Sequence, residues 1–220
     1  MKEKLTVISE WGLAGGGAEL ATRSIINLLK NHFDITLVTG KREKLDGIRC
    51  IYEPLLSRRE KVLLWLNNRI MLVKAHFRKL IEDTDVLYLP RYSFAIIPWA
   101  KGLGKKVVVH LHDYIPVTYT SNVLAPYEDH KRRLLEDDKT LECMKGARYR
   151  VGILIFWWLP KLARRWLAKA DAIICVSYRH AKIISELAPE LAEKITTIHN
   201  PMPPEIANTN FNKSLDNIPT

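Results

Sequence analysis

The sequence predicts an α/β protein with a Rossmann-like open parallel sheet of about seven strands and helices on both faces. Short runs rich in Val, Ile and Leu alternate with stretches of helix length that are apolar on one side. The runs are nearly continuously apolar, which is typical of parallel strands buried on both faces. The 220 residues suit one domain with a full hydrophobic core.

We expect seven strands, each a short apolar run bounded by polar residues, Gly or Pro. They lie near residues 4–9, 34–39, 47–52, 85–89, 106–111, 171–176 and 194–198. Helical stretches separate most of them, so neighbouring strands can run parallel.

Helices are expected near residues 18–31 and 93–102. A later helix is expected to begin after Ser177, whose hydroxyl can cap it, and to stop near Pro189.

The helix between the third and fourth strands has the clearest pattern. Residues 57–60, Ser-Arg-Arg-Glu, match a capping box, which marks a helix start. Apolar residues then recur at helical spacing: Val62, Leu66, Ile70, Val73, Phe77 and Leu80. We expect one helix whose apolar stripe packs into the core.

Residues 1–200 are expected to form the domain, with a long irregular insertion at 113–147. The insertion holds a mixed-charge run at 128–133. The Pro- and Asn-rich stretch 201–220 is typical of a linker or tail.

Composition narrows the class of protein. The longest nearly continuous apolar run, 151–159, is much shorter than the roughly 20 residues of a membrane-spanning helix. The N-terminus has no secretion signal pattern, so we expect a cytoplasmic protein that can also bind peripherally to the inner face of the membrane. Three isolated cysteines support neither a zinc site nor a disulfide framework. The net charge of +10 calls for an anionic partner.

A glycine loop follows the first strand: Gly15, Gly16, Gly17, Ala18 and Glu19. Such a loop lets the backbone approach a phosphate at a helix N-terminus, although it can also be a tight turn without a ligand. The dinucleotide fingerprint fails because its third glycine and a ribose-binding acid are both missing. There is no G-K-[ST] motif of a P-loop ATPase either. No cofactor is expected.

The fifth strand ends in His110, Leu111, His112 and Asp113. Ligands of open parallel sheets bind outside the carboxyl ends of the strands, so His112 and Asp113 are candidates for chemistry. The alternative is a structural histidine with satisfied hydrogen bonds. No third ligand is evident, and no metal site is expected.

Residues 148–169 contain several cations and no acid. The candidate patch consists of Arg148, Arg150, Trp157, Trp158, Lys161, Arg164, Arg165 and Trp166. A helix starting at Pro160 would be basic on one face and apolar on the other. Such a patch could rest on an anionic membrane surface, or it could be a core helix with a solvated basic face. No nucleic-acid reading motif is present, so nucleic acid is not an expected partner.

Taken in order, these motifs resemble the N-terminal, acceptor-side domain of the family 4 (group 1) glycosyltransferases, whose GT-B fold has two Rossmann-like domains facing a cleft. The resemblance rests on four segments along 4–204: 16–19 (Gly-Gly-Ala-Glu), 112–113 (His-Asp), 170–177 (Ala-Asp-Ala-Ile-Ile-Cys-Val-Ser) and 195–201 (Ile-Thr-Thr-Ile-His-Asn-Pro).

The resemblance implies a retaining transfer of a sugar from a nucleotide-sugar to a glycan or lipid-linked acceptor. It implies that His112 lines the sugar pocket as the catalytic residue, and that donor or substrate contacts come from Gly16, Gly17, Glu19, Asp113, Ser177 and Asn200. The family's second domain is absent, so the chain alone is expected to be inactive without that domain in cis or as a separate chain. The competing hypothesis is a non-catalytic module that binds a membrane surface or a protein partner.

Overall fold

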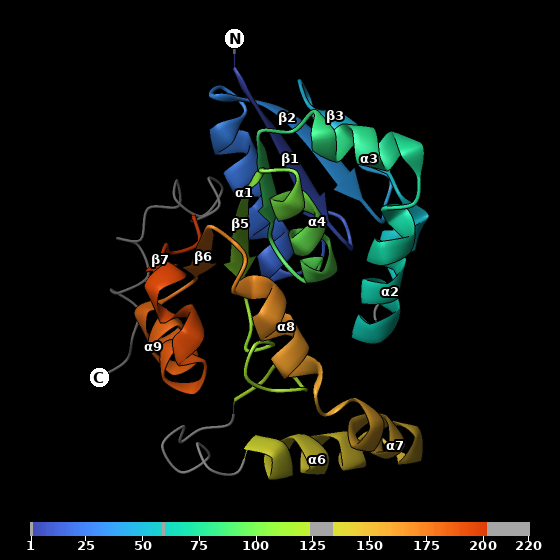
Figure 1. Ribbon diagram of the computed structural model, residues 1–220, viewed down its shortest axis with the longest axis vertical. Coiled ribbons are helices and arrows are strands. Elements are labelled where there is room, and N and C mark those ends of the chain that lie inside the picture. The colour runs from blue at the N-terminus through green and yellow to red at the C-terminus, as the bar shows by residue number, and fades with distance from the viewer. Residues whose placement is uncertain (1, 59, 124–133, 202–220) are drawn as a thin grey trace, which may run out of the picture.

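Seven parallel strands form a single sheet in the computed structural model, which describes residues 2–58, 60–123 and 134–201. The strand order is β3-β2-β1-β4-β5-β6-β7 (Figure 1). The strands are β1 Glu3–Ser9, β2 Phe33–Thr39, β3 Arg49–Tyr52, β4 Val86–Leu89, β5 Lys106–Leu111, β6 Ala172–Cys175 and β7 Ile195–Thr197. All seven predicted strands are confirmed. Together they make the Rossmann-like half of a GT-B fold.

Helices cover both faces of this sheet. Those in the described part of the chain are α1 Gly17–Leu29, α2 Lys61–Met71, α3 Ala75–Glu82, α4 Ile97–Gly102, α6 Leu134–Met144, α7 Ala147–Phe156, α8 Leu159–Leu167 and α9 Tyr178–Leu187. Short 3-10 turns, η1 Pro54–Ser57, η2 Phe94–Ile96 and η3 Pro189–Lys194, complete the connections.

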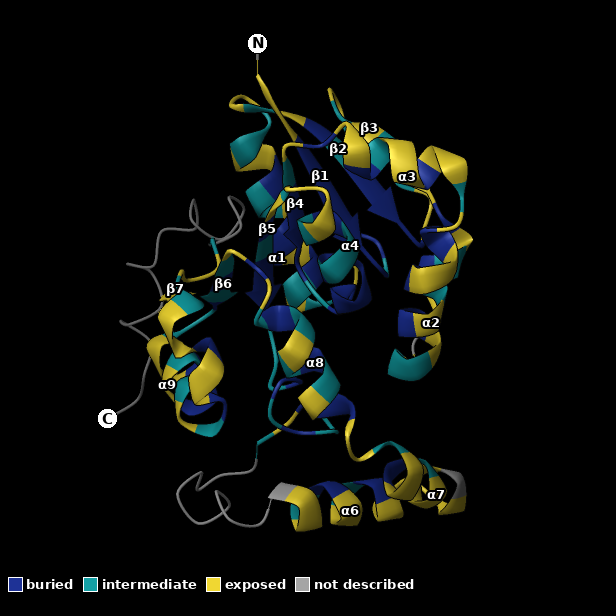
Figure 2. Ribbon diagram, viewed as in Figure 1, coloured by how far each residue is buried: buried dark blue, intermediate teal, exposed yellow. Residues whose placement is uncertain are grey.

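The core has two parts because successive side chains of a strand point to opposite faces. Leu5 and Val7 of β1 pack with Ile26 of α1 in the smaller part. Ile8 belongs to the larger part, which includes side chains of α2, α3, α4 and α8. Burial on both faces explains the nearly continuous apolar runs of the strands (Figure 2).

The single helix predicted after the third strand is wrong in two respects. First, Ser57 ends the turn η1, and its hydroxyl donates to the carbonyl of Pro54 instead of capping a helix. Second, the helix is broken into α2 and α3 at Lys74, whose backbone is extended and whose ammonium lies 2.7 Å from Glu53. The capping-box prediction failed because the backbone is extended at Arg58 and Glu60, so the helix begins only at Lys61.

The predicted apolar stripe of this region is also wrong in its middle. Phe77 is buried, but Leu66, Ile70 and Val73 are exposed. The core face of α2 consists of Leu64, Trp65, Asn68 and Met71. Because α2 is apolar on two sides, periodicity alone could not tell which side packs inward.

The predicted irregular insertion, 113–147, contains the regular helix α6 and the first residue of α7. Asp138 of α6 accepts hydrogen bonds from the backbone N–H groups of Tyr119 and Thr120, so the helix is tied to the segment that follows β5. The mixed-charge run at 128–133 and nearly all of the predicted tail at 201–220 lie outside the described residues. No helix in the described ranges has the length and apolar character needed to cross a bilayer.

Candidate functional site

The strand order places a topological switch point between β1 and β4. One connection leaves β1 toward β2 and the other crosses from β3 to β4, so the loops after β1 and β4 meet at the carboxyl edge of the sheet. Open parallel sheets bind their ligands in the crevice at such a point. The residues that follow β1, β4, β5 and β6 therefore define the candidate site.

The backbone conformation of the glycine loop leads the chain from β1 into the N-terminus of α1. Gly15 has φ +118°, a conformation that favours glycine, and Gly16 is the extended residue that precedes α1. No side chain caps the helix, so the first N–H groups of α1 have no capping partner. A Cβ on Gly16 would lie 2.3 Å from Oε2 of Glu19. The loop thus offers bare backbone at a helix N-terminus, which suits an anion.

Glu19 is held beneath this loop by an ion pair. Its carboxylate accepts a hydrogen bond from the guanidinium of Arg91, which follows β4, and both side chains are largely buried. The guanidinium also lies over the ring of Trp11, 4.3 Å from its centroid. The sequence analysis predicted that Glu19 contacts the sugar donor or the substrate. In the structure its carboxylate is instead paired with Arg91, beside the glycine loop.

Glu10 is a site residue that the sequence analysis missed. It follows β1 directly and is completely buried. Its Oε1 accepts hydrogen bonds from the Tyr92 backbone N–H at 2.9 Å and the Ser93 hydroxyl at 2.6 Å, while Oε2 has no partner among the described residues. Burial raises the pKa of Glu10, against the hydrogen bond from Ser93. The available signal was an acid directly after an apolar strand.

His112 lies at the end of β5 with a free ring nitrogen. Its ring lies against that of His110, with 4.3 Å between the ring centroids, so the two side chains lie on the same side of the strand. Burial lowers the pKa of His112 to about 3, helped by the charges of His110, Arg91 and His180. The imidazole is therefore neutral near pH 7. Its Nε2 is buried without a hydrogen-bond partner in the described structure, so the hydrogen-bonding capacity of this nitrogen is unsatisfied there.

Asp113 joins β4, β5 and α9. Its carboxylate accepts a hydrogen bond from the Tyr92 hydroxyl, and its backbone carbonyl lies 2.9 Å from Nε2 of His180. Ser177 caps α9 as predicted, because its hydroxyl accepts a hydrogen bond from the His180 backbone N–H at 3.1 Å. Asn200 lies beyond β7 and is exposed. The structure thus brings Asp113 together with the His180 side chain and uses Ser177 as a helix cap. Asn200 has no hydrogen bond to these residues in the described structure.

Lys61 is the second residue that the sequence analysis missed. It begins α2, and its ammonium donates to the carbonyl of Tyr119 at 2.7 Å and to the hydroxyl of Ser121. Burial lowers the pKa of Lys61 to about 8, although the charge of Asp113 and other acids opposes the shift. Lys61 therefore fastens the segment after β5 to α2 beside the site.

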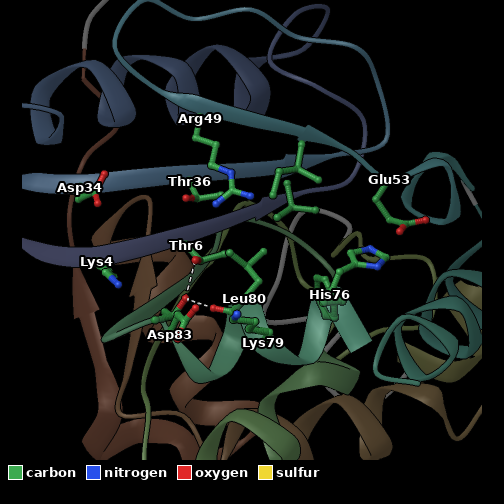
Figure 3. Close-up of a pocket in the computed structure, with 14 residues that line it drawn as sticks. Lys4, Thr6, Asp34, Thr36, Arg49, Glu53, His76, Lys79, Leu80 and Asp83 are labelled. Carbon is green, nitrogen blue, oxygen red and sulfur yellow. Dashed lines mark hydrogen bonds between the residues drawn. The ribbon is translucent and has the colours of Figure 1, made fainter. Parts of the chain in front are cut away.

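Two hollows in the structure are candidates for the binding site. One of about 380 Å³ is formed at the glycine loop by residues that include Trp11, Gly16 and Lys41. A larger one of about 470 Å³ lies between α3 and the sheet, with Lys4, Asp34 and other acidic and basic side chains around it (Figure 3). The larger hollow runs along one face of β1, β2 and β3 beside α3, and no residue of the loops after β1, β4, β5 or β6 lines it. We therefore assign the site to the smaller one.

Some residues of the predicted basic tryptophan patch are packed into the protein, and others are exposed to solvent. The apolar face of α8 packs into the core, where Trp166 contacts Trp65 at 5.0 Å between ring centroids. Arg164 bonds the carbonyl of Leu187 at 3.2 Å and lies 3.6 Å from Glu190. The exposed members of the patch are Arg150, Trp157, Trp158, Lys161 and Arg165, and the Arg148 side chain lies outside the described structure. Helix α8 is a core helix with a solvated basic face.

No cluster of three potential metal-binding side chains, His, Cys, Asp or Glu, occurs in the part of the chain that the structure describes. The site residues that lie close together are paired with one another, as Glu19 is with Arg91, Asp113 with Tyr92 and His112 with His110. The groups left for a ligand are the backbone N–H groups at the start of α1 and the neutral imidazole of His112.

The buried histidines predict a loss of stability in acid. Burial lowers the pKa of His110 to about 4, against about 6.5 in an unfolded chain. The unfolded chain binds the proton first, so this stability is present above pH 6.5 and is lost as the pH falls toward 4. Between pH 7 and pH 5 we expect His110 to reduce the free energy of unfolding by about 2 kcal/mol.

The measurement is urea unfolding at both pH values for the wild type and for His110→Asn. The asparagine amide can replace the ring Nδ1 that lies 2.7 Å from the Tyr88 hydroxyl. Comparing the two proteins removes the opposite contribution of Glu10, whose raised pKa favours the folded state in acid. An equal pH slope in both proteins would show that His110 is not the source.

Comparisons with known proteins agree with this fold. The family model described as Glycosyltransferase Family 4 matches residues 15–206. No match was found among curated protein sequences.

Solved structures share the fold at low sequence identity. The structure of Anabaena Alr3699/HepE in complex with UDP and glucose has a TM-score of 0.52 and 14% identity over 91% of this chain and 45% of that one. UGT71G1 of Medicago truncatula complexed with UDP-glucose has a TM-score of 0.52 and 14% identity over 92% and 54%. Os79 of O. sativa in complex with U2F and trichothecene has a TM-score of 0.50 and 13% identity over 91% and 53%.

The chain therefore spans about half the length of the solved structures that it resembles. The family match covers most of the 220 residues and includes the glycine loop, His112 and Ser177. This chain belongs to Glycosyltransferase Family 4.

Proposed function

We propose that this chain supplies the acceptor-side half of a retaining glycosyltransferase, which transfers a sugar from a nucleotide-sugar to a glycan or lipid-linked acceptor. One observation carries the proposal: a bare helix N-terminus and a neutral histidine with a free Nε2 lie at the same edge of the sheet. They are linked electrostatically through Arg91, which bonds Glu19 beside the glycine loop and whose charge helps to lower the pKa of His112.

In this proposal the glycine loop faces the donor diphosphate. The N–H groups after Gly16 and the partial positive charge of α1 stabilise the negative charge that develops as the diphosphate leaves. A loop without side chains allows the phosphates to approach the backbone. The related structures of Anabaena HepE and Medicago UGT71G1 are complexes with UDP and glucose or with UDP-glucose, which supports a nucleotide-sugar as the donor.

His112 acts on the sugar through hydrogen bonding. Its pKa of about 3 keeps the ring uncharged, so it holds a single ring proton and offers the sugar one hydrogen bond through Nε2. This role positions the sugar near the bond that breaks and requires no change in the protonation of His112. The Tyr92 hydroxyl fixes Asp113, and through it the chain that follows His112.

The second half of the cleft binds the nucleotide, and its residues are supplied in cis or by a separate polypeptide. The acceptor lies on this chain's side, against the segment after β5 that Lys61 and Asp138 anchor. We place the reaction in the cytoplasm.

Reconstitution tests the proposal. The chain is combined with a donor-side domain of the same family, fused after Thr220 or added separately, and release of nucleoside diphosphate is measured with a set of nucleotide-sugars. We expect transfer only when both halves are present, with the product keeping the donor's anomeric configuration. An inverted product would contradict the retaining course, and no transfer from any donor would contradict the proposed function.

A further inference from the structure

Large apolar side chains are exposed on two helices that the proposed cleft does not use. On α2 and directly after it they are Leu63, Leu66, Ile70 and Val73. On α7 and directly after it they are Tyr149, Val151, Leu154, Ile155, Trp157 and Trp158. In the view of Figure 2 helix α7 lies below α2. Large apolar side chains exposed in such numbers mark an interaction site.

The exposed residues of α2 form one face. Residues 63, 66, 70 and 73 are spaced by three, four and three, which places them on one side of a helix. The exposed fractions of Leu66 and Val73 are 55% and 72%. The opposite side of α2 is already occupied by the core through Leu64, Trp65 and Met71. The outer face therefore has no packing partner within the described structure.

Helix α7 continues into a pair of tryptophans. Leu154 and Ile155 are 61% and 55% exposed. Trp158 donates its indole N–H to the carbonyl of Ile155 at 2.8 Å, and the ammonium of Lys161 lies 5.0 Å from the ring centroid of Trp157. Partly exposed indoles beside a cation are typical of the boundary between water and lipid.

The charge of both helices has one sign. Residues 61–74 contain no acid, and neither do residues 143–170. Exposed cations accompany the apolar faces: Arg69, Arg150, Lys161 and Arg165. Lys145 is also exposed, but its ammonium is paired with Glu142 at 2.6 Å. An apolar helix face with cations around it is complementary to an anionic lipid surface, whereas the centres of protein interfaces are poor in lysine.

We propose that the outer faces of α2 and α7 bind the surface of an anionic membrane. The apolar side chains enter the boundary between headgroups and acyl chains, and the cations contact lipid phosphates. This surface shares Arg150, Trp157, Trp158, Lys161 and Arg165 with the patch expected from the sequence. Its apolar part comes from α2 and α7, because the apolar side of α8 is buried. The inference does not depend on the proposed sugar transfer.

Vesicle flotation of the full chain tests the proposal. The vesicles are phosphatidylglycerol and phosphatidylcholine in equal parts, with pure phosphatidylcholine for comparison. We expect binding to the anionic vesicles that weakens as salt is raised, and little binding to the neutral ones. Leu66→Glu with Ile70→Glu, and separately Leu154→Glu with Ile155→Glu, are each expected to weaken binding about tenfold or more.

The matched control is Leu20→Glu with Leu28→Glu on α1, which makes the same charge change at residues that are 47% and 64% exposed. It is expected to bind within about twofold of the wild type. Serine at the α2 and α7 positions repeats the test if a glutamate variant fails to fold. No binding to anionic vesicles, or equal weakening by the control, would overturn the proposal. So would a solution dimer that the α2 or α7 variants dissociate, because a second copy would then cover these faces.

Discussion

Replacing His112 with alanine is expected to lower the turnover number of the reconstituted enzyme about 100-fold or more. The buried Nε2 has no other partner in the described structure, so the hydrogen bond that it offers the sugar would be lost without substitution. The loss should appear in kcat more than in KM if this bond strengthens in the transition state. Release of nucleoside diphosphate in the presence of the second domain is the measurement.

Two further variants separate chemistry from folding. His112→Gln keeps a group able to donate a hydrogen bond and is expected to recover part of the activity. His32→Ala changes an exposed histidine in the turn before β2, at the opposite edge of the sheet, and is expected to be fully active. Full turnover by His112→Ala, or a loss that follows its thermal unfolding, would remove His112 from the catalytic site.

Replacing Gly40 with alanine is expected to lower the free energy of unfolding by at least about 4 kcal/mol. Gly40 follows β2, and an added Cβ would lie 2.2 Å from the carbonyl oxygen of Glu10 and 2.6 Å from the backbone nitrogen of Ser57. Both neighbours are backbone atoms, so no side-chain rotation can relieve the contact. A loss of this size is a large part of a domain's total stability.

Urea unfolding measures this effect, with Gly102→Ala as the control. A Cβ on Gly102, the last residue of α4, would meet no atom within 4 Å. Alanine is the better helix former there, so the control is expected to be neutral or slightly more stable. A Gly40→Ala protein as stable as the control would show that the backbone around Glu10 can move apart.

Sequence reasoning predicted the sheet well because parallel strands buried on both faces leave strong local patterns. It failed at α2, where apolar residues occur on both sides and only the position of the sheet decides that Trp65 is inside and Leu66 outside. It also missed α6, which is tied to the rest of the molecule by Asp138, a contact that no local pattern announces.

In the candidate site too, sequence reasoning found the features that have a local pattern and missed those that depend on distant residues. His112 and the glycine loop could be found because both follow predicted strands at the carboxyl edge. The partners that hold them could not be found, because Arg91 and Glu19 are 72 residues apart in the chain. Glu10 stood at a predictable place, but its burial depends on Ser93, another distant residue.

The strand order has a consequence for how the chain is synthesised. Each of the strands β2 to β7 pairs with a strand that precedes it in the sequence, and each joins an outer edge of the sheet already present. A nascent chain leaving the ribosome therefore never has to open two paired strands to insert a third. Once β4 has emerged, both walls of the β1 switch point exist, before β5 and His112 have left the ribosome.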